Sequence, residues 1–328
     1  MDITLKSTLS NKKTFMILSA VCVLLGALSC VLGELLLPAL VGVLAALYLF
    51  DRNNKNSYSF WVSVILLVLN AAAFLTGISI SFFGIAAVIL AKMICSAFVK
   101  NQSKADTAYL MTLISAIFTV VSCILLAMAL QNVYTLDAAM AFYKDFADYL
   151  KEIFLMTTMQ IYSEAGVQVT EEMLVLVFDQ QVSLIISYLV IGSFVIVGLS
   201  MKLFGLIVSK CAEDNTPILK WRFITTNVYA YFYVILAFAS VFVNPIGNVL
   251  GVSVMNLYNI FMVVFAYVGF NYALALLRRR MKRVSSFILL SIITLVFMAL
   301  AIELLSFLGA IFTIRKSREI RPQTPLNP

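Results

Sequence analysis

Amide and phenol side chains that could hold a polar solute gather in one apolar stretch, residues 251–277. It contains Asn256, Asn259, Tyr267 and Asn271, which fall within an arc of about 120° on a helix that turns about 100° per residue. A row of amides faces hydrocarbon only at a high free-energy cost, so it faces protein or water. The row therefore predicts either hydrogen bonds between helices or the lining of a cavity for a polar heterocycle or a carboxylate.

Two acids lie inside apolar stretches, Glu34 and Glu303. From the helical rise we expect Glu303 about 27 Å from the cytoplasmic start of its helix, near the outer surface, with Glu34 at the same level. They are either solvated helix ends or an acidic pair that binds a cation or relays a proton at the mouth of a site. The candidate substrate-binding residues are therefore Glu34, Asn256, Asn259, Tyr267 and Glu303.

The residues that most enzymes and zinc sites require are missing from the sequence. The chain has no His, and its five Cys form no CxxC pair, so His-based zinc sites and His general bases are excluded. A P-loop, an HExxH motif and a GxSxG motif are also absent. We expect no enzymatic activity, no metal site and no cofactor, so an ATPase that drives transport would be a separate chain.

The elements that carry these residues are membrane spans. The chain has 328 residues, of which 62% are apolar and 12% charged, and its mean hydropathy is +1.02. Apolar runs of about 18 residues or more recur, and each is long enough to cross a bilayer. They lack the alternation of barrel strands, and helices satisfy their own backbone hydrogen bonds in lipid. We predict an all-α, polytopic transmembrane helical bundle of about nine spans, within a range of about eight to ten.

Breaks in the apolar runs divide the chain into these spans. The first run is too long for one helix, and Gly33, Glu34 and Pro38 supply a turn between two helices. The expected spans are 14–33, 36–50, two within 58–99 that meet at 76–81, 108–131, 182–208, 223–243, 251–277 and 285–312. They form an N-terminal membrane half of five spans (1–131), an outer amphipathic region (132–181), a C-terminal membrane half of about four spans (182–313) and a basic tail (314–328).

Lysine and arginine are distributed unequally between the two faces of this layout. Sixteen of the 23 basic residues lie on the face of the N-terminus, whereas region 132–181 has eight acids against Lys144 and Lys151. Positive loops face the cytoplasm, so we expect the N-terminus inside and region 132–181 outside. The same rule accounts for the net charge of +7, and we expect no nucleic-acid partner.

The basic tail disagrees with this layout, because nine spans would put its four basic residues outside. Either these charges do not orient the tail, or the last apolar stretch turns back, or one helix pair is miscounted.

The outer region contains an amphipathic helix at 138–154. Its apolar residues recur every four positions on one face, namely Phe142, Phe146, Leu150 and Phe154. The helix either lies on the outer membrane surface or packs over the helix ends, or it forms a lid over an outward-facing pocket. A second helix begins at Glu171 and Glu172, because acids suit a first turn.

Small residues form a stripe on the first helix at positions i, i+3, i+4 and i+7. They are Gly26, Ser29, Cys30 and Gly33. Such a stripe allows helices to approach closely, and it serves either internal packing or the docking of a partner membrane protein. On another span Asn70 is expected near mid-membrane, where its amide needs a partner on a neighbouring helix.

Several segments together resemble a known family. They are the hairpin from Gly33 to Pro38, the entry "LKWRFITTNVYAY" into the seventh span, Gly269 with the basic turn after it, and the closing "LSFLGAIFTIRKSR". Over residues 14–318 the chain resembles the YybS-like family of uncharacterised bacterial multi-pass membrane proteins. That family is grouped distantly with the substrate-binding S components of energy-coupling-factor vitamin transporters.

The resemblance implies an S-component-like protein of the bacterial cell membrane that binds or helps to import a small polar, vitamin-like metabolite. Its partners would be the lipid bilayer and a membrane scaffold subunit with separate ATPases. The alternative is a non-transporting membrane scaffold or assembly partner, which would dock other membrane proteins through the small-residue stripe.

Overall fold

The structure is a computed structural model that describes residues 12–77, 82–211, 218, 221, 223–243, 248–280 and 301–320. Within these ranges every regular element is a helix, as the hydropathy pattern predicts. Contacts divide the chain into two units. Unit 1 takes its residues from Met1–Ile161 and Gly192–Arg222, and unit 2 from Tyr162–Ile191 and Phe223–Pro328.

Unit 1 begins with the predicted helical hairpin. The helix α1 (Lys12–Leu32) is followed by a short 3-10 turn, η1 (Gly33–Leu36), and by α2 (Leu37–Asn54). Gly33 has a φ of +59°, a conformation that favours glycine. Pro38 lies in the first turn of α2, where its missing N–H leaves no helical hydrogen bond unmade. The break at Gly33 and Pro38 is therefore confirmed.

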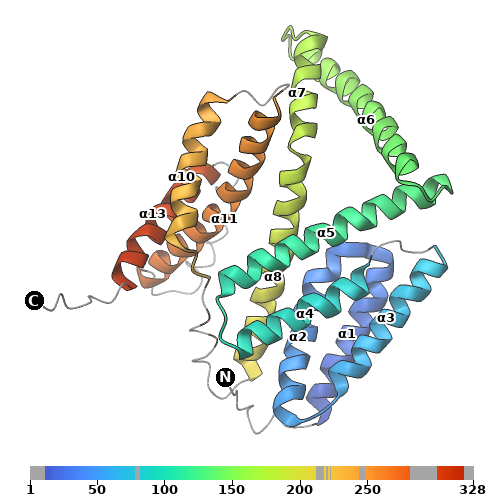
Figure 1. The fold of residues 1–328 in the computed structure, drawn as a ribbon, viewed down its shortest axis with the longest axis vertical. Coiled ribbons are helices and arrows are strands. Elements are labelled where there is room, and N and C mark those ends of the chain that lie inside the picture. Colours follow the sequence, from blue (N-terminus) through green and yellow to red (C-terminus); the bar gives the residue numbers. More distant parts are fainter. Residues whose placement is uncertain are drawn as a thin grey trace, which may run out of the picture. The chain divides into compact units, whose positions relative to one another are not determined.

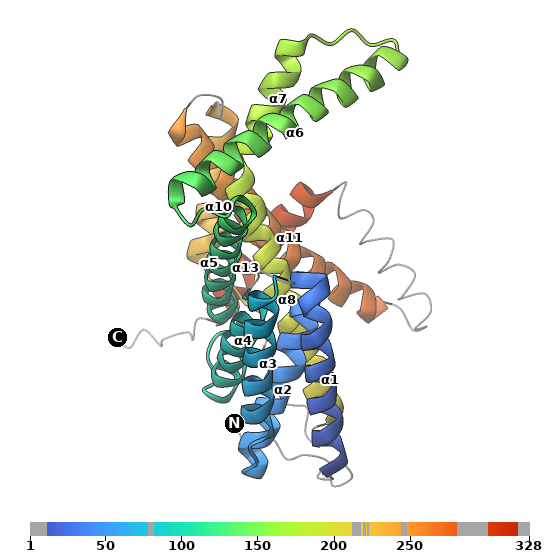
Figure 2. The same cartoon turned by 90° about the vertical axis from the view of Figure 1, so that its right-hand side faces the viewer.

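The helix α2 forms the centre of unit 1. Its side chains Leu40, Leu44 and Leu47 are fully buried, and it packs against α1 and α4 (Phe83–Val99). At Gly42 a Cβ would lie 3.0 Å from the Ser200 carbonyl oxygen of α8 (Ile185–Cys211), so glycine permits close packing there. In both views α1, α2, α4 and α3 (Tyr58–Leu75) lie side by side (Figures 1 and 2).

The helices α5, α6 and α7 follow the predicted order along the chain. The helix α5 (Lys104–Gln131) begins four residues before the expected span. The helix α6 (Leu136–Glu164) is amphipathic but extends ten residues beyond the predicted end at 154. The helix α7 (Glu171–Ser183) begins at Glu171 as expected, and Thr170 caps it by accepting a hydrogen bond from the Met173 amide.

A side-chain hydrogen bond holds the first part of α6 against α5. The Tyr143 hydroxyl donates to the carbonyl oxygen of Cys123 at 2.6 Å. Burial, together with Cys123, raises the pKa of Tyr143 to about 12. Most other side chains of α6 remain outside any packed core, and Ala139 is its buried residue.

Unit 2 contains α7, the start of α8, and three further helices. These are α10 (Asn227–Phe242), α11 (Val249–Arg280) and α13 (Ile302–Ile320). The helices α11 and α13 touch through glycine: a Cβ on Gly269 would collide with the Leu305 carbonyl oxygen, and one on Gly309 with that of Phe265. Tyr233 of α10 is fully buried against Phe265.

The last predicted span, 285–312, differs from the structure. The backbone bends at Ala301, and α13 begins at Ile302 and continues to Ile320, so this helix covers only the last part of the predicted span and extends beyond its end. Residues 281–300 lie outside the described ranges. Glu303 therefore lies in the first turn of a helix rather than about 27 Å along one.

Length and composition support a membrane location for the described helices. Five are long and apolar enough to cross a bilayer, namely Thr14–Leu32, Tyr58–Leu75, Lys104–Gln131, Ile185–Cys211 and Val249–Leu276. Two shorter apolar helices are Phe83–Val99 and Asn227–Phe242. The polytopic helical class is confirmed, whereas the count of about nine spans is not.

Candidate functional site

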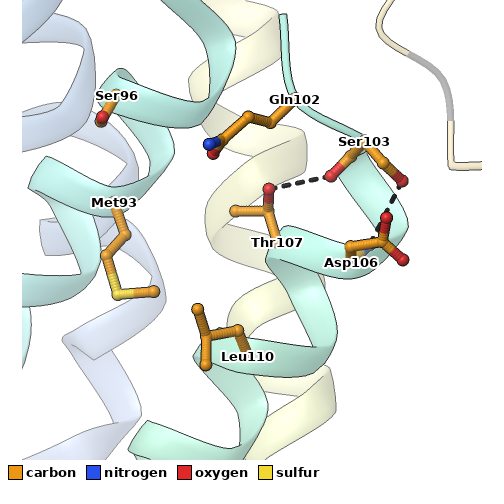
Figure 3. Close-up of a pocket in the computed structure, with 7 residues that line it drawn as sticks. All are labelled: Met93, Ser96, Gln102, Ser103, Asp106, Thr107 and Leu110. Atoms are coloured by element: carbon orange, nitrogen blue, oxygen red, sulfur yellow. Dashed lines mark hydrogen bonds between the residues drawn. The ribbon is translucent and has the colours of Figure 1, made fainter. Parts of the chain in front are cut away.

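A cleft of about 440 Å³ opens in unit 1 where α4 ends and α5 begins (Figure 3). Five of its lining residues are polar and two are apolar: Ser96, Gln102, Ser103, Asp106, Thr107, Met93 and Leu110. In Figure 3 the polar groups lie around the α4–α5 turn, while Met93 and Leu110 line the part farther from it. The cleft thus combines a polar end with an apolar end, as small-molecule sites commonly do.

Local hydrogen bonds fix the turn that shapes this cleft. Asn101 adopts a positive φ of 53°, and the Gln102 amide donates to the Ala97 carbonyl at 2.8 Å, which closes the end of α4. The Ser103 hydroxyl accepts from the Asp106 amide at 3.3 Å and so caps α5. The Thr107 hydroxyl donates to the Ser103 carbonyl at 2.8 Å.

The side chain of Trp221 packs against the same turn and hydrogen-bonds to it. The Trp221 indole N–H donates to the Gln102 carbonyl at 2.9 Å. Its ring meets Phe98 of α4 and Phe204 of α8 edge to face, at 5.3 and 6.0 Å between centroids. The Lys104 ammonium lies 4.9 Å from the centroid of the Trp221 ring, in cation–π contact. These contacts hold the Gln102 backbone in place beside the cleft.

The groups around the cleft can recognise a neutral or weakly charged polar molecule. The Gln102 side-chain amide supplies both donors and an acceptor, and the Ser96 hydroxyl can donate or accept. The Thr107 hydroxyl, which already donates to Ser103, can only accept, and Asp106 supplies an acceptor carboxylate. Two other cavities in unit 1, of about 570 and 420 Å³, are lined mainly by apolar side chains and suit lipid chains instead. None of these three cavities is lined by a residue of the predicted substrate site.

Asn256, the first member of the predicted amide row, forms hydrogen bonds with backbone groups of α7, α8 and its own helix α11. Its Oδ1 accepts from the Ser187 amide at 2.8 Å, and its Nδ2 donates to the carbonyls of Ser183 and Val252, each at 2.9 Å. Ser183 ends α7 and Ser187 lies in the first turn of α8, on either side of a break at Leu184. Asn256 therefore satisfies backbone groups that the helix break leaves open.

Asn259 and Tyr267, the other two predicted binding residues of α11, have different surroundings. Asn259 is half-buried, one turn after Asn256. Tyr267 meets Phe223 edge to face at 5.4 Å, and its carbonyl accepts from the Asn271 amide at 2.8 Å. The side-chain amides of Asn256 and Asn271 thus bond to protein groups. Binding of a substrate by the residues of this row stays a prediction.

The two predicted acids belong to different units. Glu303 is exposed, its carbonyl accepts from the Ser306 hydroxyl at 2.6 Å, and its charge acts on Tyr258 of α11. The backbone of Glu34 lies in η1, and its side chain is outside what the structure describes. The pairing of Glu34 with Glu303 therefore stays a prediction.

Members of the small-residue stripe have different surroundings. Gly26 packs against α3, where a Cβ would collide with the Leu66 side chain. Ser29 is fully buried and Cys30 half-buried, and their side chains donate to the carbonyls of Leu25 and Gly26. Gly33 has no atom near its Cβ position and belongs to the turn. Internal packing accounts for Gly26, and docking of a partner stays a prediction.

Sequence reasoning missed the cleft residues and the buried acid Asp51. Asp51 is 3% exposed, although its sequence, "DRNNKNS", is typical of a solvated loop. Gln102, Ser103 and Asp106 likewise lie in a short polar turn that has the composition of an ordinary loop. Ser103 followed three residues later by an acid was the available signal, because it marks a helix start.

The helices and the cleft define a polytopic helical membrane protein with a polar site at one helix turn. Residues 15–311 match the family described as "Predicted membrane protein (DUF2232)". The chain therefore belongs to the DUF2232 family of predicted membrane proteins. No curated protein and no solved structure matches it, so the likeness to YybS and to S components stays a prediction.

Proposed function

We propose that this membrane protein binds a small polar metabolite in the α4–α5 cleft and helps to import it, in the manner of an S component. The cleft itself is the observation that carries the proposal. Its volume of about 440 Å³ matches a small ligand, and its polar and apolar ends match a vitamin-like molecule with both kinds of surface.

The expected orientation of the chain predicts at which face of the membrane the cleft opens. Lys100 and Lys104 flank the turn, and the positive-inside rule places them in the cytoplasm of a bacterial cell with region 132–181 outside. The cleft would then present the metabolite at the inner face of the membrane.

Ligand-induced stabilisation of the purified protein tests the binding proposal. We expect one compound from a panel of water-soluble vitamins to raise the thermal midpoint, because a ligand that binds only the folded state stabilises it. Gln102→Ala and Ser96→Ala should each lower the affinity for this compound by at least about tenfold, which corresponds to the loss of roughly one good hydrogen bond. Gln131→Ala, at the other end of α5, is the matched control and should leave it unchanged.

A second candidate function is supported by the exposed apolar face of α6. Phe146, Tyr149, Ile153 and Met156 recur along one side of this helix and are all exposed. This arrangement favours the scaffold or assembly-partner alternative. Co-purification distinguishes the two: a scaffold subunit with an ATPase pair supports import, whereas other membrane proteins in its place support assembly.

A further inference from the structure

Asp51 of α2 is a buried carboxylate that the α4–α5 cleft does not use. It is 3% exposed and lies one turn before the end of α2, in the interior of unit 1. A carboxylate out of water costs several kcal/mol unless its oxygens have partners. The partners of its two oxygens therefore decide what Asp51 does.

One carboxylate oxygen of Asp51 serves the neighbouring helix. Its Oδ2 accepts a hydrogen bond from the backbone amide of Ser59, in the first turn of α3. This amide is one of the open donors of a helix start, where the helix dipole also favours negative charge. The side chain of Ser57, at the N-cap position of α3, makes no capping bond, so Asp51 replaces it from another helix.

The second oxygen is buried without a partner. Asp51 Oδ1 has no hydrogen-bond partner among the described residues. A half-satisfied carboxylate at this depth calls for a bound species that carries positive charge or donates a hydrogen bond.

Two hydrogen-bonded hydroxyl groups belong to the same region of α2 and α3. Tyr48 lies one turn before Asp51 and interacts with it electrostatically. The Tyr48 hydroxyl is 2.5 Å from the Ser63 hydroxyl, which in turn donates to the Ser59 carbonyl at 2.6 Å. The cluster thus offers several oxygen atoms and one carboxylate, all held between α2 and α3.

Two cationic side chains lie near this cluster. Arg52 follows Asp51 on α2 and is exposed. Lys92 of α4 is also exposed, and its ammonium lies 5.7 Å from the centroid of the Tyr48 ring. Neither donates to Oδ1, so the buried charge is not neutralised by a direct ion pair within the described part of the chain.

We propose that Asp51 binds a monovalent metal cation through Oδ1, with the hydroxyl oxygens of Tyr48 and Ser63 as neighbouring donors. A hard cation prefers oxygen ligands, and a single carboxylate balances a single positive charge. The site shares no residue with the α4–α5 cleft. Its existence does not depend on metabolite binding, and within a transporter it would hold the ion that is coupled to movement of the solute.

Thermal unfolding of the purified protein in NaCl, KCl or choline chloride, at equal ionic strength, tests this site. We expect Na⁺ or K⁺ to raise the midpoint above its value in choline in a saturable way, because the ion binds only the folded state. Asp51→Asn should abolish the difference. This variant keeps an oxygen acceptor for the Ser59 amide and so preserves the cap of α3 while removing the charge.

Controls separate the cation site from a general effect of salt. Asp148→Asn removes an exposed acid of α6 and should leave the cation effect intact. Tyr48→Phe and Ser63→Ala should raise the half-saturating cation concentration. If Asp51→Asn does not fold, these two variants test the cation site in its place. Equal midpoints in all three salts would overturn the proposal, as would a cation effect that persists in Asp51→Asn.

Lys92→Gln tests whether the Lys92 ammonium is the true partner of Asp51. If it is, Lys92→Gln and Asp51→Asn lower the thermal midpoint by the same amount, and the midpoint of the unmodified protein is the same in NaCl, KCl and choline chloride. That result would refute the cation site. If the proposal is right, Lys92→Gln keeps or strengthens the response to Na⁺, because it removes a nearby positive charge.

Discussion

Buried polar side chains in this protein complete the ends of neighbouring helices. Asp51 of α2 accepts from the start of α3, and Asn70 of α3 accepts from the Gly84 amide at the start of α4 at 3.1 Å. Asn256 of α11 does the same for the start of α8. Because these backbone donors are buried away from water, a side chain from another helix supplies the acceptor that water would otherwise provide.

Replacing Asn256 with Leu should destabilise the protein. The change leaves the Ser183 carbonyl and the Ser187 amide unpaired, and each buried unpaired group costs about 1–3 kcal/mol. Unfolding in mixed detergent micelles measures this loss. Asn259→Leu, at a half-buried amide one turn away, is the control and should cost less. Equal stability of the two variants would show that Asn256 does not hold the α7–α8 break.

Close contacts at glycine decide how the helices pack. In unit 2 the backbones of α11 and α13 meet at Gly269 and Gly309, and in unit 1 Gly42 and Gly84 bring α2 and α4 against α8 and α3. Backbone approach of this kind stabilises apolar helices in lipid, where burial of apolar area supplies little. Of the predicted stripe, Gly26 packs closely against a side chain of α3, whereas Gly269 and Gly309 approach backbone atoms more closely still.

Gly269→Ala should separate α11 from α13. Its methyl group would meet the backbone carbonyl of Leu305, which cannot rotate away, so we expect a loss of about 1–3 kcal/mol. Unfolding in mixed detergent micelles again supplies the measurement. Gly198→Ala in α8 is matched, because nothing lies near its Cβ position, and it should be neutral or slightly stabilising. An equal effect of both changes would contradict the proposed contact.

At the scale of the whole molecule, the helices form two interleaved units. The chain enters unit 2 at Tyr162, returns to unit 1 at Gly192 and enters unit 2 again at Phe223. The helix α8 therefore contributes its first residues to one unit and the rest to the other. The chain therefore passes from one unit to the other within α6 and again within α8.

Reporter fusions should place α6 and the α2–α3 turn on opposite sides of the membrane. Alkaline phosphatase, which is active only outside the cytoplasm, should be active when fused after Asp148 and inactive after Lys55, because basic loops stay inside. A cytoplasmic fluorescent reporter at the same two positions should give the opposite pattern. Activity of alkaline phosphatase fused after Lys55 would contradict the proposed orientation and would imply that the α4–α5 cleft opens at the outer face.

The helical membrane class, the hairpin at Gly33 and Pro38, and the start of α7 at Glu171 could all be predicted from the sequence. Hydrophobic runs and helix-end residues act locally along the chain, so the order of residues is enough to recognise them. The hydrogen bonds of Asn256 to the α7–α8 break, the burial of Asp51 and the cleft bordered by polar residues around Gln102 became evident only from the packing of the helices. Those facts depend on which helices meet, and hydrogen bonds between residues such as Ser187 and Asn256, 69 positions apart, leave no pattern in the sequence.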